Sequence, residues 1–178
     1  LLGGPQTGFV VGRKDLIAQI NKNPMKRALR VDKIRIAALE ATLKLYRDPD
    51  RLAERLPTVR LFARPLADIR AAAQRMQPIV ARALGVDFAV AIEDCASQIG
   101  SGALPLEGIP SAGLAIRTSK AKGGGLNALS IALRELPVPV LGHMADQALI
   151  LDMRCLDDEA GFARNLAALK PGAINALA

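Results

Sequence analysis

The chain has 178 residues, of which 51% are hydrophobic, 23% are charged and 3% are aromatic, and its formal net charge is +7. This hydrophobic fraction excludes a disordered chain, and the scarcity of aromatic residues argues against a surface that stacks single-stranded nucleic acid. The positive charge favours a polyanionic partner, although a soluble protein with arginine-rich helix faces has the same composition.

Cysteine, histidine and hydropathy exclude further classes. The chain has two cysteines, Cys95 and Cys155, and one histidine, His143. These numbers do not make a disulfide framework, and no metal-ligand spacing or catalytic triad surrounds them. We therefore expect reduced, buried thiols, a surface histidine and no metal site. No apolar run approaches the roughly 18 residues of a membrane span, and the first residues do not show the basic-then-apolar pattern of a signal peptide. We therefore expect a cytoplasmic protein without a membrane or DNA partner.

The first 31 residues do not follow an ordinary helix or strand pattern. Gly3, Gly4 and Pro5 predict a tight turn. Residues 7–12 are apolar and bounded by glycines, which predicts a short buried strand. Residues 14–20 predict a short helix.

Three more helices are predicted before the period of the hydrophobic pattern changes. Asp32 should cap an amphipathic helix that ends near Tyr46. Pro57 suits the first position of a short helix. A longer helix should run from Pro65 to Gly85 and bury a stripe composed of Leu66, Ile69, Ala73, Met76 and Val80.

After Gly85 the pattern favours strands and shorter helices. The expected elements are a strand around 88–92, a loop at 97–110, a strand at 113–118, a turn at 120–125, a helix at 126–136, a hairpin of 140–144 with 148–153, and a helix at 157–169. Helices combined with mainly antiparallel strands predict a two-layer α+β domain for residues 65–178.

Two groups of residues could bind an anion. Arg27 and Arg30 lie three apart, so their guanidinium groups could converge on one tetrahedral oxyanion. A solvated basic linker explains the same spacing. The turn from Gly3 to Gln6 could hold a phosphate through backbone N–H groups, or it could simply precede a strand. The polar loop from Ser97 to Gly102 could line a cleft or lie in solvent.

Several strings resemble one family when they are taken in order. They are LLGGPQTGFVVGRKDLI, PMKRALRVDK, AALEATLKLY, LPTVRLFAR, CASQIGSGALP and LPVPVLGHM. Together they resemble the C-terminal part of bacterial selenocysteine synthases, the L-seryl-tRNA(Sec) selenium transferases, which are fold-type-I pyridoxal-phosphate enzymes. The match covers nearly the whole chain. It implies a C-terminal remnant of the cofactor-binding large domain at 1–31, linking helices at 32–64 and a C-terminal α+β domain at 65–178.

The resemblance also implies an activity and its site. Such enzymes convert seryl-tRNA(Sec) to selenocysteinyl-tRNA(Sec) with selenophosphate, and they form homo-oligomers. Arg27 and Arg30 match the arginines that hold the anionic group of the selenium donor, while Gly3, Gly4 and Gln6 should lie near pyridoxal phosphate. In the family the lysine that binds this cofactor directly precedes the string that begins at Leu1. We therefore expect a fragment that is inactive alone.

Two alternatives stay open at this point. The first is a related fold-type-I lyase that acts on a small phosphorylated amino sugar, in which the arginines would hold the substrate's phosphate. The second is a basic tRNA-binding module without catalysis, which the net charge of +7 favours and the scarcity of aromatic residues disfavours.

Overall fold

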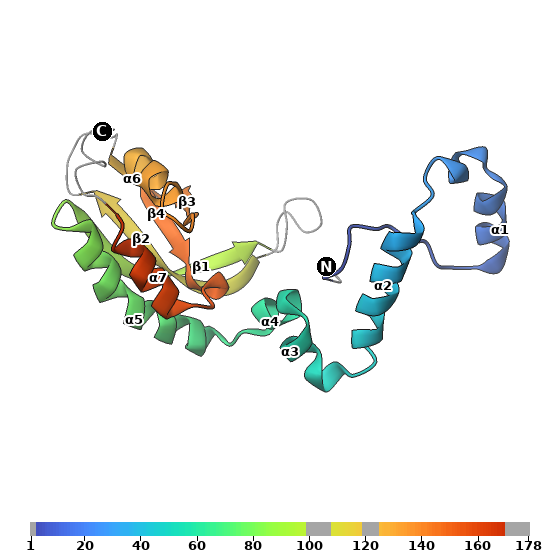
Figure 1. Cartoon of the computed structure of the whole chain (residues 1–178), viewed down its shortest axis with the longest axis horizontal. Helices are drawn as coiled ribbons and strands as arrows, with labels where there is room; N and C mark the ends of the chain where they lie inside the picture. Colours follow the sequence, from blue (N-terminus) through green and yellow to red (C-terminus); the bar gives the residue numbers. More distant parts are fainter. Residues whose placement is uncertain (1–2, 99–107, 119–124, 170–178) are drawn as a thin grey trace. The chain divides into compact units, whose positions relative to one another are not determined.

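A computed structural model of the chain describes residues 3–98, 108–118 and 125–169 (Figure 1). The chain divides into two compact units, Leu1–Ala63 and Arg64–Ala178. Most of the predicted loop at 97–110 and of the predicted turn at 120–125 lies outside the described residues. The assignment of residues 1–31 to a cofactor-binding domain stays a prediction.

The first unit contains only helices among its described residues. They are α1 (Lys14–Lys22), η1 (Pro24–Arg27), α2 (Lys33–Leu45), η2 (Pro49–Arg51), α3 (Leu52–Arg55) and α4 (Pro57–Ala63). The helices predicted at 14–20, after Asp32 and after Pro57 are confirmed. Asp32 caps α2 as expected, because its carboxylate accepts a hydrogen bond of 2.9 Å from the backbone N–H of Arg35.

The buried strand predicted at residues 7–12 is wrong. The structure has no strand there, and the side chains of Phe9, Val10 and Val11 are 57%, 70% and 82% exposed. A strand needs a neighbour to pair its backbone groups, and no described strand of this unit lies beside the run. An apolar run in the sequence reports a tendency to be buried and does not identify the surface that buries it.

The second unit is an α+β domain, as predicted. Its elements are α5 (Leu66–Leu84), β1 (Phe88–Gln98), β2 (Gly108–Thr118), α6 (Gly125–Arg134), β3 (His143–Ala145), β4 (Ala148–Asp152), η3 (Met153–Cys155) and α7 (Glu159–Leu166). The four strands form one antiparallel sheet in the order β1-β2-β4-β3.

The core of this unit lies between one face of the sheet and helices α5, α6 and α7 (Figure 1). Leu114 of β2 pairs with Leu151 of β4, so both side chains point to the same face. They contact a continuous cluster of buried residues that includes Ile69, Val80 and Leu129. The stripe predicted for α5 is buried except for Leu66, which is partly buried.

Several strands begin or end at other residues than predicted, for local reasons. Strands β1 and β2 extend into the predicted loop at 97–110, because Ser97 and Ile109 still pair across the hairpin. Strand β3 begins at His143 instead of 140, because the Val140 N–H donates to the Leu133 carbonyl at 2.9 Å and holds the chain against the end of α6.

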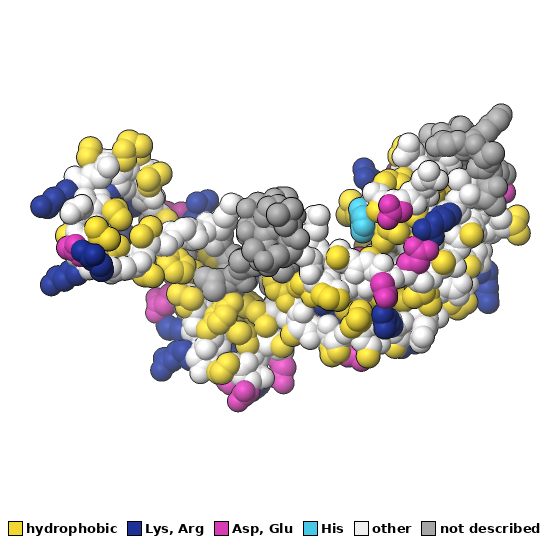
Figure 2. Space-filling view, turned by 180° about the vertical axis from the view of Figure 1, so that it is seen from behind, with side chains coloured by type: hydrophobic (Ala, Val, Ile, Leu, Met, Phe, Trp, Pro, Cys, Tyr) yellow, Lys and Arg dark blue, Asp and Glu magenta, His cyan; other side chains and the backbone are white. Residues whose placement is uncertain are grey.

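The predicted β3–β4 hairpin is confirmed, although its turn contains no glycine. Asp146 and Gln147 both adopt positive φ angles, of 47° and 57°, as a two-residue turn of this twist requires. The histidine at the start of β3 is exposed, as predicted, and is visible on the surface in Figure 2.

Candidate functional site

The turn at η1 brings Arg27 and Arg30 to one hollow in the first unit. The hollow has a volume of about 630 Å³. Its lining consists of Ile20, Asn21, Asn23, Met25, Lys26, Arg27, Leu29 and Arg30. The lining therefore combines cationic and amide side chains with apolar ones.

The local sequence explains this arrangement. Pro24 occupies the first position of η1, where a missing N–H costs nothing. The Met25 carbonyl accepts hydrogen bonds from the N–H groups of Ala28 and Leu29, at 3.0 and 3.1 Å, which continues the turn beyond η1. Arg27 ends η1, and Arg30 directly follows the turn that continues it, so that both arginines line the hollow.

The cations of the hollow lack carboxylate partners. Among the described residues, Lys26, Arg27 and Arg30 make no ion pair or side-chain hydrogen bond. Some other basic residues of this unit are neutralised locally: Arg13 bonds Asp15 at 2.6 Å, and Lys44 bonds Glu40 at 2.8 Å. The surface of this unit shows hydrophobic side chains beside Lys and Arg side chains (Figure 2). An exposed set of unneutralised cations can bind a small anion.

The glycine pair at the start of the chain packs closely against the rest of the first unit. Gly3 has a φ of +79°, and a Cβ there would lie 3.0 Å from the Leu56 side chain. A Cβ on Gly4 would lie 2.7 Å from the Thr42 hydroxyl. These contacts explain both glycines without a ligand, and they leave backbone N–H groups as what the pair can offer to an anion.

Two polar side chains next to this turn remain available. Gln6 is exposed. The Thr7 hydroxyl oxygen is buried and has no hydrogen-bond partner among the described residues. Buried polar atoms normally have a partner, so Thr7 is a second indication of a ligand or a further protein surface here. This region therefore fits the edge of a cofactor pocket and does not enclose a cofactor.

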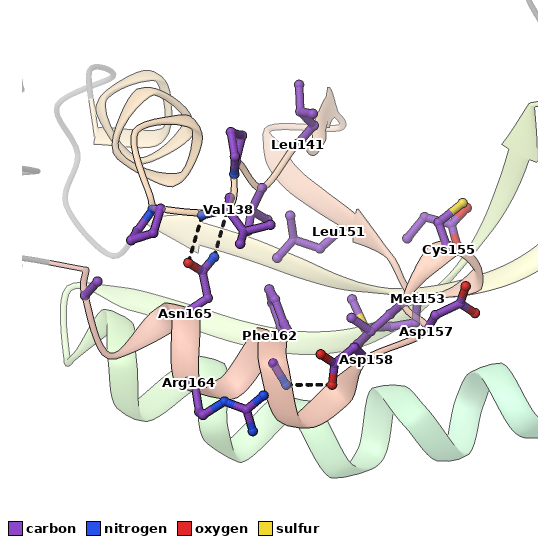
Figure 3. Close-up of a pocket in the computed structure, with 17 residues that line it drawn as sticks. Val138, Leu141, Leu151, Met153, Cys155, Asp157, Asp158, Phe162, Arg164 and Asn165 are labelled. Atoms are coloured by element: carbon purple, nitrogen blue, oxygen red, sulfur yellow. Dashed lines mark hydrogen bonds between the residues drawn. The ribbon is translucent and has the colours of Figure 1, made fainter.

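A second hollow lies in the second unit, between the segment after α6, the end of β4 and helix α7 (Figure 3). It measures about 920 Å³ and is mainly apolar, with Phe162 and Leu151 pointing toward one another. Two of its polar residues are occupied by the fold. Asn165 exchanges two hydrogen bonds with the Val138 backbone, at 3.1 and 2.7 Å, and Asp158 caps α7. The groove therefore presents no nucleophile paired with a base.

A buried polar cluster supports the end of β1. Arg154 is 3% exposed and donates to the Ser97 hydroxyl at 2.9 Å and to the Pro110 carbonyl at 2.7 Å. Ser97 and Ser111 both donate to the Asp152 carboxylate. This cluster joins three strand ends through charge-assisted bonds, so we regard it as structural.

The cysteines are poor nucleophiles. Burial, with a contribution from the nearby charge of Asp152, raises the pKa of Cys95 to about 11. Burial also raises the pKa of Cys155. The expectation that both thiols are buried is wrong, because Cys95 is half-buried and Cys155 is exposed, but both are free as predicted. Raised pKa values keep the thiol protonated at neutral pH and therefore unreactive.

Metal-binding clusters and membrane-spanning helices are absent from the described ranges. There, no three His, Cys, Asp or Glu side chains gather in a way that could hold a metal ion. No described helix is long and apolar enough to cross a membrane.

The sequence interpretation missed part of the cationic hollow. Arg27 and Arg30 were identified, and both line it. Lys26 and Asn23 were not assigned a role. An Asn directly before a Pro is a recognisable start signal for a helical turn, and it could have identified Asn23.

Comparison with known proteins identifies relatives of nearly the whole chain. Residues 1–157 match the model of the L-seryl-tRNA selenium transferase family. The chain is 60% identical over 174 residues to an L-seryl-tRNA(Sec) selenium transferase of Methylocella silvestris, which is 98% of this chain and 37% of that protein. It is 60% identical over 167 residues to that of Rhizobium meliloti and 52% identical over 162 residues to that of Salmonella paratyphi B. These matches cover 93% and 91% of this chain and 35% of each relative, so the chain spans little more than a third of these proteins.

Proposed function

The chain belongs to the L-seryl-tRNA selenium transferase family, and on that premise we propose that it is the C-terminal part of an enzyme that converts seryl-tRNA(Sec) to selenocysteinyl-tRNA(Sec). The selenium donor is selenophosphate. The observation that carries this proposal within the chain is the hollow in which Lys26, Arg27 and Arg30 meet without carboxylate partners.

In this proposal, Arg27 and Arg30 bind the phosphoryl oxygens of selenophosphate. Each guanidinium offers a planar fork of N–H donors that matches two oxygens of a tetrahedral anion, and Lys26 adds a third charge. Met25 and Leu29 form part of the apolar lining of the hollow. A selenium atom is large, polarisable and weakly hydrated, so such a wall suits it better than it suits a phosphate oxygen.

The proposed cofactor is pyridoxal phosphate, which when bound supplies the electron sink for chemistry at the seryl side chain. Gly3 and Gly4 would contribute backbone N–H groups at the edge of its pocket, and Gln6 would contribute its exposed side-chain amide. The orphaned hydroxyl of Thr7 supports a ligand or protein surface at this place.

A chimaera tests the proposed role of the arginines. We would replace the matching third of the Methylocella silvestris enzyme with this chain and measure selenocysteinyl-tRNA formation at increasing selenophosphate. Arg27→Ala combined with Arg30→Ala should lower turnover about a hundredfold or more, because two charge-assisted contacts to the donor are lost, while the absorbance of bound cofactor stays intact. Arg47→Ala combined with Arg55→Ala is the matched control, since both arginines belong to the same unit and lie outside the hollow. Unchanged turnover in the Arg27 and Arg30 variant would refute the role.

The same chimaera separates the transferase from the lyase alternative. A lyase would release ammonia from a phosphorylated amino sugar and ignore seryl-tRNA, and its arginines would hold the sugar phosphate.

We propose a cytoplasmic homo-oligomer, because the tRNA substrate is cytoplasmic and the first unit exposes apolar side chains such as Val11 and Leu29, at 82% and 76%, that suit an interface.

A second candidate function is tRNA contact through the first unit. Residues 1–63 carry 13 Lys and Arg against 6 Asp and Glu, whereas residues 64–178 carry 11 of each kind. The whole net charge of +7 therefore resides in the first unit. Binding of tRNA by this chain should weaken steeply with salt. Charge-reversing Lys33→Glu should reduce the salt slope, and the absence of binding at low salt would remove this candidate.

A further inference from the structure

We propose that Asn23 is a positioning residue for the cationic hollow: its side chain fixes the η1 turn that holds Arg27 beside Arg30. The inference rests on the proposed function, because it concerns how the donor-binding arginines are arranged. The Asn23 side-chain oxygen accepts a hydrogen bond of 2.9 Å from the Met25 N–H. The Asn23 carbonyl accepts a second bond, of 3.1 Å, from the Lys26 N–H.

These bonds matter because burial contributes little to holding the turn among the described residues. Neither α1 nor η1 contains a buried residue. A four-residue 3₁₀ turn is marginally stable by itself, and its first N–H groups have no partners within the turn. Asn23 satisfies the N–H groups of both Met25 and Lys26, so it contributes a large share of what orders this segment.

The η1 turn then determines how far apart the side chains of Arg27 and Arg30 lie in the hollow. Met25, whose N–H is capped, also accepts hydrogen bonds through its carbonyl from Ala28 and Leu29. These bonds hold residues 25–29 in a turn, which contains Arg27 and directly precedes Arg30. Without the cap, the two guanidinium groups would sample many separations, and the fraction of molecules able to bind one anion with both would fall.

A neighbouring residue provides a matched control. Asn21 also lines the hollow, has the same side chain and is exposed like Asn23. Among the described residues, however, its side chain makes no capping bond. A general effect of removing an amide from the hollow should therefore be equal at both positions, whereas a positioning effect should appear at Asn23 alone.

The experiment uses the 178-residue chain with thiophosphate as a stable probe. Nuclear magnetic resonance titration would follow the Nε–H signals of Arg27 and Arg30, and hydrogen exchange would follow the Met25 amide. Asn23→Ala should weaken thiophosphate binding about fivefold and speed Met25 exchange by a similar factor, the effect typical of a lost N-cap. Asn23→Ser should restore both values to within about twofold, since serine caps comparably. Asn21→Ala should change neither.

Other outcomes overturn the proposal in distinguishable ways. Equal losses in Asn23→Ala and Asn21→Ala would show that the amides act generally. Weakened binding with unchanged Met25 exchange would show that Asn23 contacts the anion directly and does not position the arginines. A wild-type chain that protects the Met25 amide but ignores thiophosphate would refute the anion hollow itself, and with it the proposed donor-binding role.

Discussion

Among described residues, the first unit buries one large hydrophobic side chain, Leu56, while the second unit builds a continuous core between three helices and a four-stranded sheet. The first unit also exposes apolar residues of the kind that usually lie in a hydrophobic core or an interface, including Val11 and Ile34 at 82% and 83%. The difference teaches that the two units obtain their order from different sources: tertiary packing in the second, and local hydrogen bonds in the first.

The ion pairs follow the same division. Four ion pairs between described residues of the first unit join residues two to four apart, as in Arg13–Asp15 and Glu40–Lys44. In the second unit they join distant elements: Arg75 reaches Glu159 across 84 residues, and Arg70 reaches Asp94 across 24. Local pairs support a helix, whereas distant pairs report that a tertiary structure has formed. Cations left unpaired in the first unit are accordingly the ones free to bind a ligand.

A pair of matched truncations should give the largest contrast between the units. Leu114 is fully buried in β2, and Leu29 is 76% exposed beside the hollow. Leu114→Ala should lower the free energy of unfolding of the second unit by about 3 kcal/mol, through lost burial and a cavity. Leu29→Ala should change the free energy of unfolding by less than about 0.5 kcal/mol, because an exposed side chain loses little contact. Urea unfolding followed by circular dichroism measures both, and comparable losses would contradict the division drawn here.

Removing the buried arginine should have the next largest effect. Arg154→Met retains an apolar stem but leaves the Pro110 carbonyl and the Ser97 hydroxyl without its guanidinium donors. We expect a loss of about 2–3 kcal/mol, since buried acceptors would be unsatisfied. Arg164→Met is the control at an exposed position of α7. If both variants unfold at the same urea concentration, the cluster around Asp152 is not a structural support.

The elements of the second unit could be predicted from sequence because the hydrophobic side chains that form their periodic patterns pack within that unit. The stripe of α5 has a complementary surface within the same 115-residue unit, so periodicity and burial coincide there. In β1, Phe88 and Val90 pack against the core, whereas Ile92 is 40% exposed. Residues 7–12 show the opposite case. Phe9 and Val10 have the composition of a buried strand, but the described part of the chain supplies no neighbour for them.

The site was predictable only in part, for a related reason. The spacing of Arg27 and Arg30 suggested convergence, and the structure places both in one hollow. Spacing alone could not distinguish a turn from an extended linker, in which side chains three apart point to different sides. What decides is the short-range bond from the Met25 N–H to Asn23, and a hydrogen bond of this kind depends on backbone angles that composition does not specify.

The smallest predicted effect concerns acid, and it compares Glu159 with Glu40. The hydrogen bond from Arg75 lowers the pKa of Glu159, and that from Lys44 lowers the pKa of Glu40. A carboxyl whose pKa is lower in the folded state stabilises that state above its ordinary pKa of about 4.5, and the contribution disappears as pH falls through the lowered value. Glu159→Gln should therefore reduce the urea midpoint of the second unit slightly at pH 7, and the difference from wild type should vanish in strong acid.

Glu40→Gln is the control that links this measurement to the comparison of the two units. Its partner Lys44 lies one helical turn away in α2, so the pair can persist whether or not the second unit is folded. We expect Glu40→Gln to leave the urea midpoint of the second unit unchanged at every pH, and to affect only the helical signal of residues 33–45. A pH-dependent shift of the second unit's midpoint in Glu40→Gln would show that the units are energetically coupled, because a local pair in one would then stabilise the packing of the other.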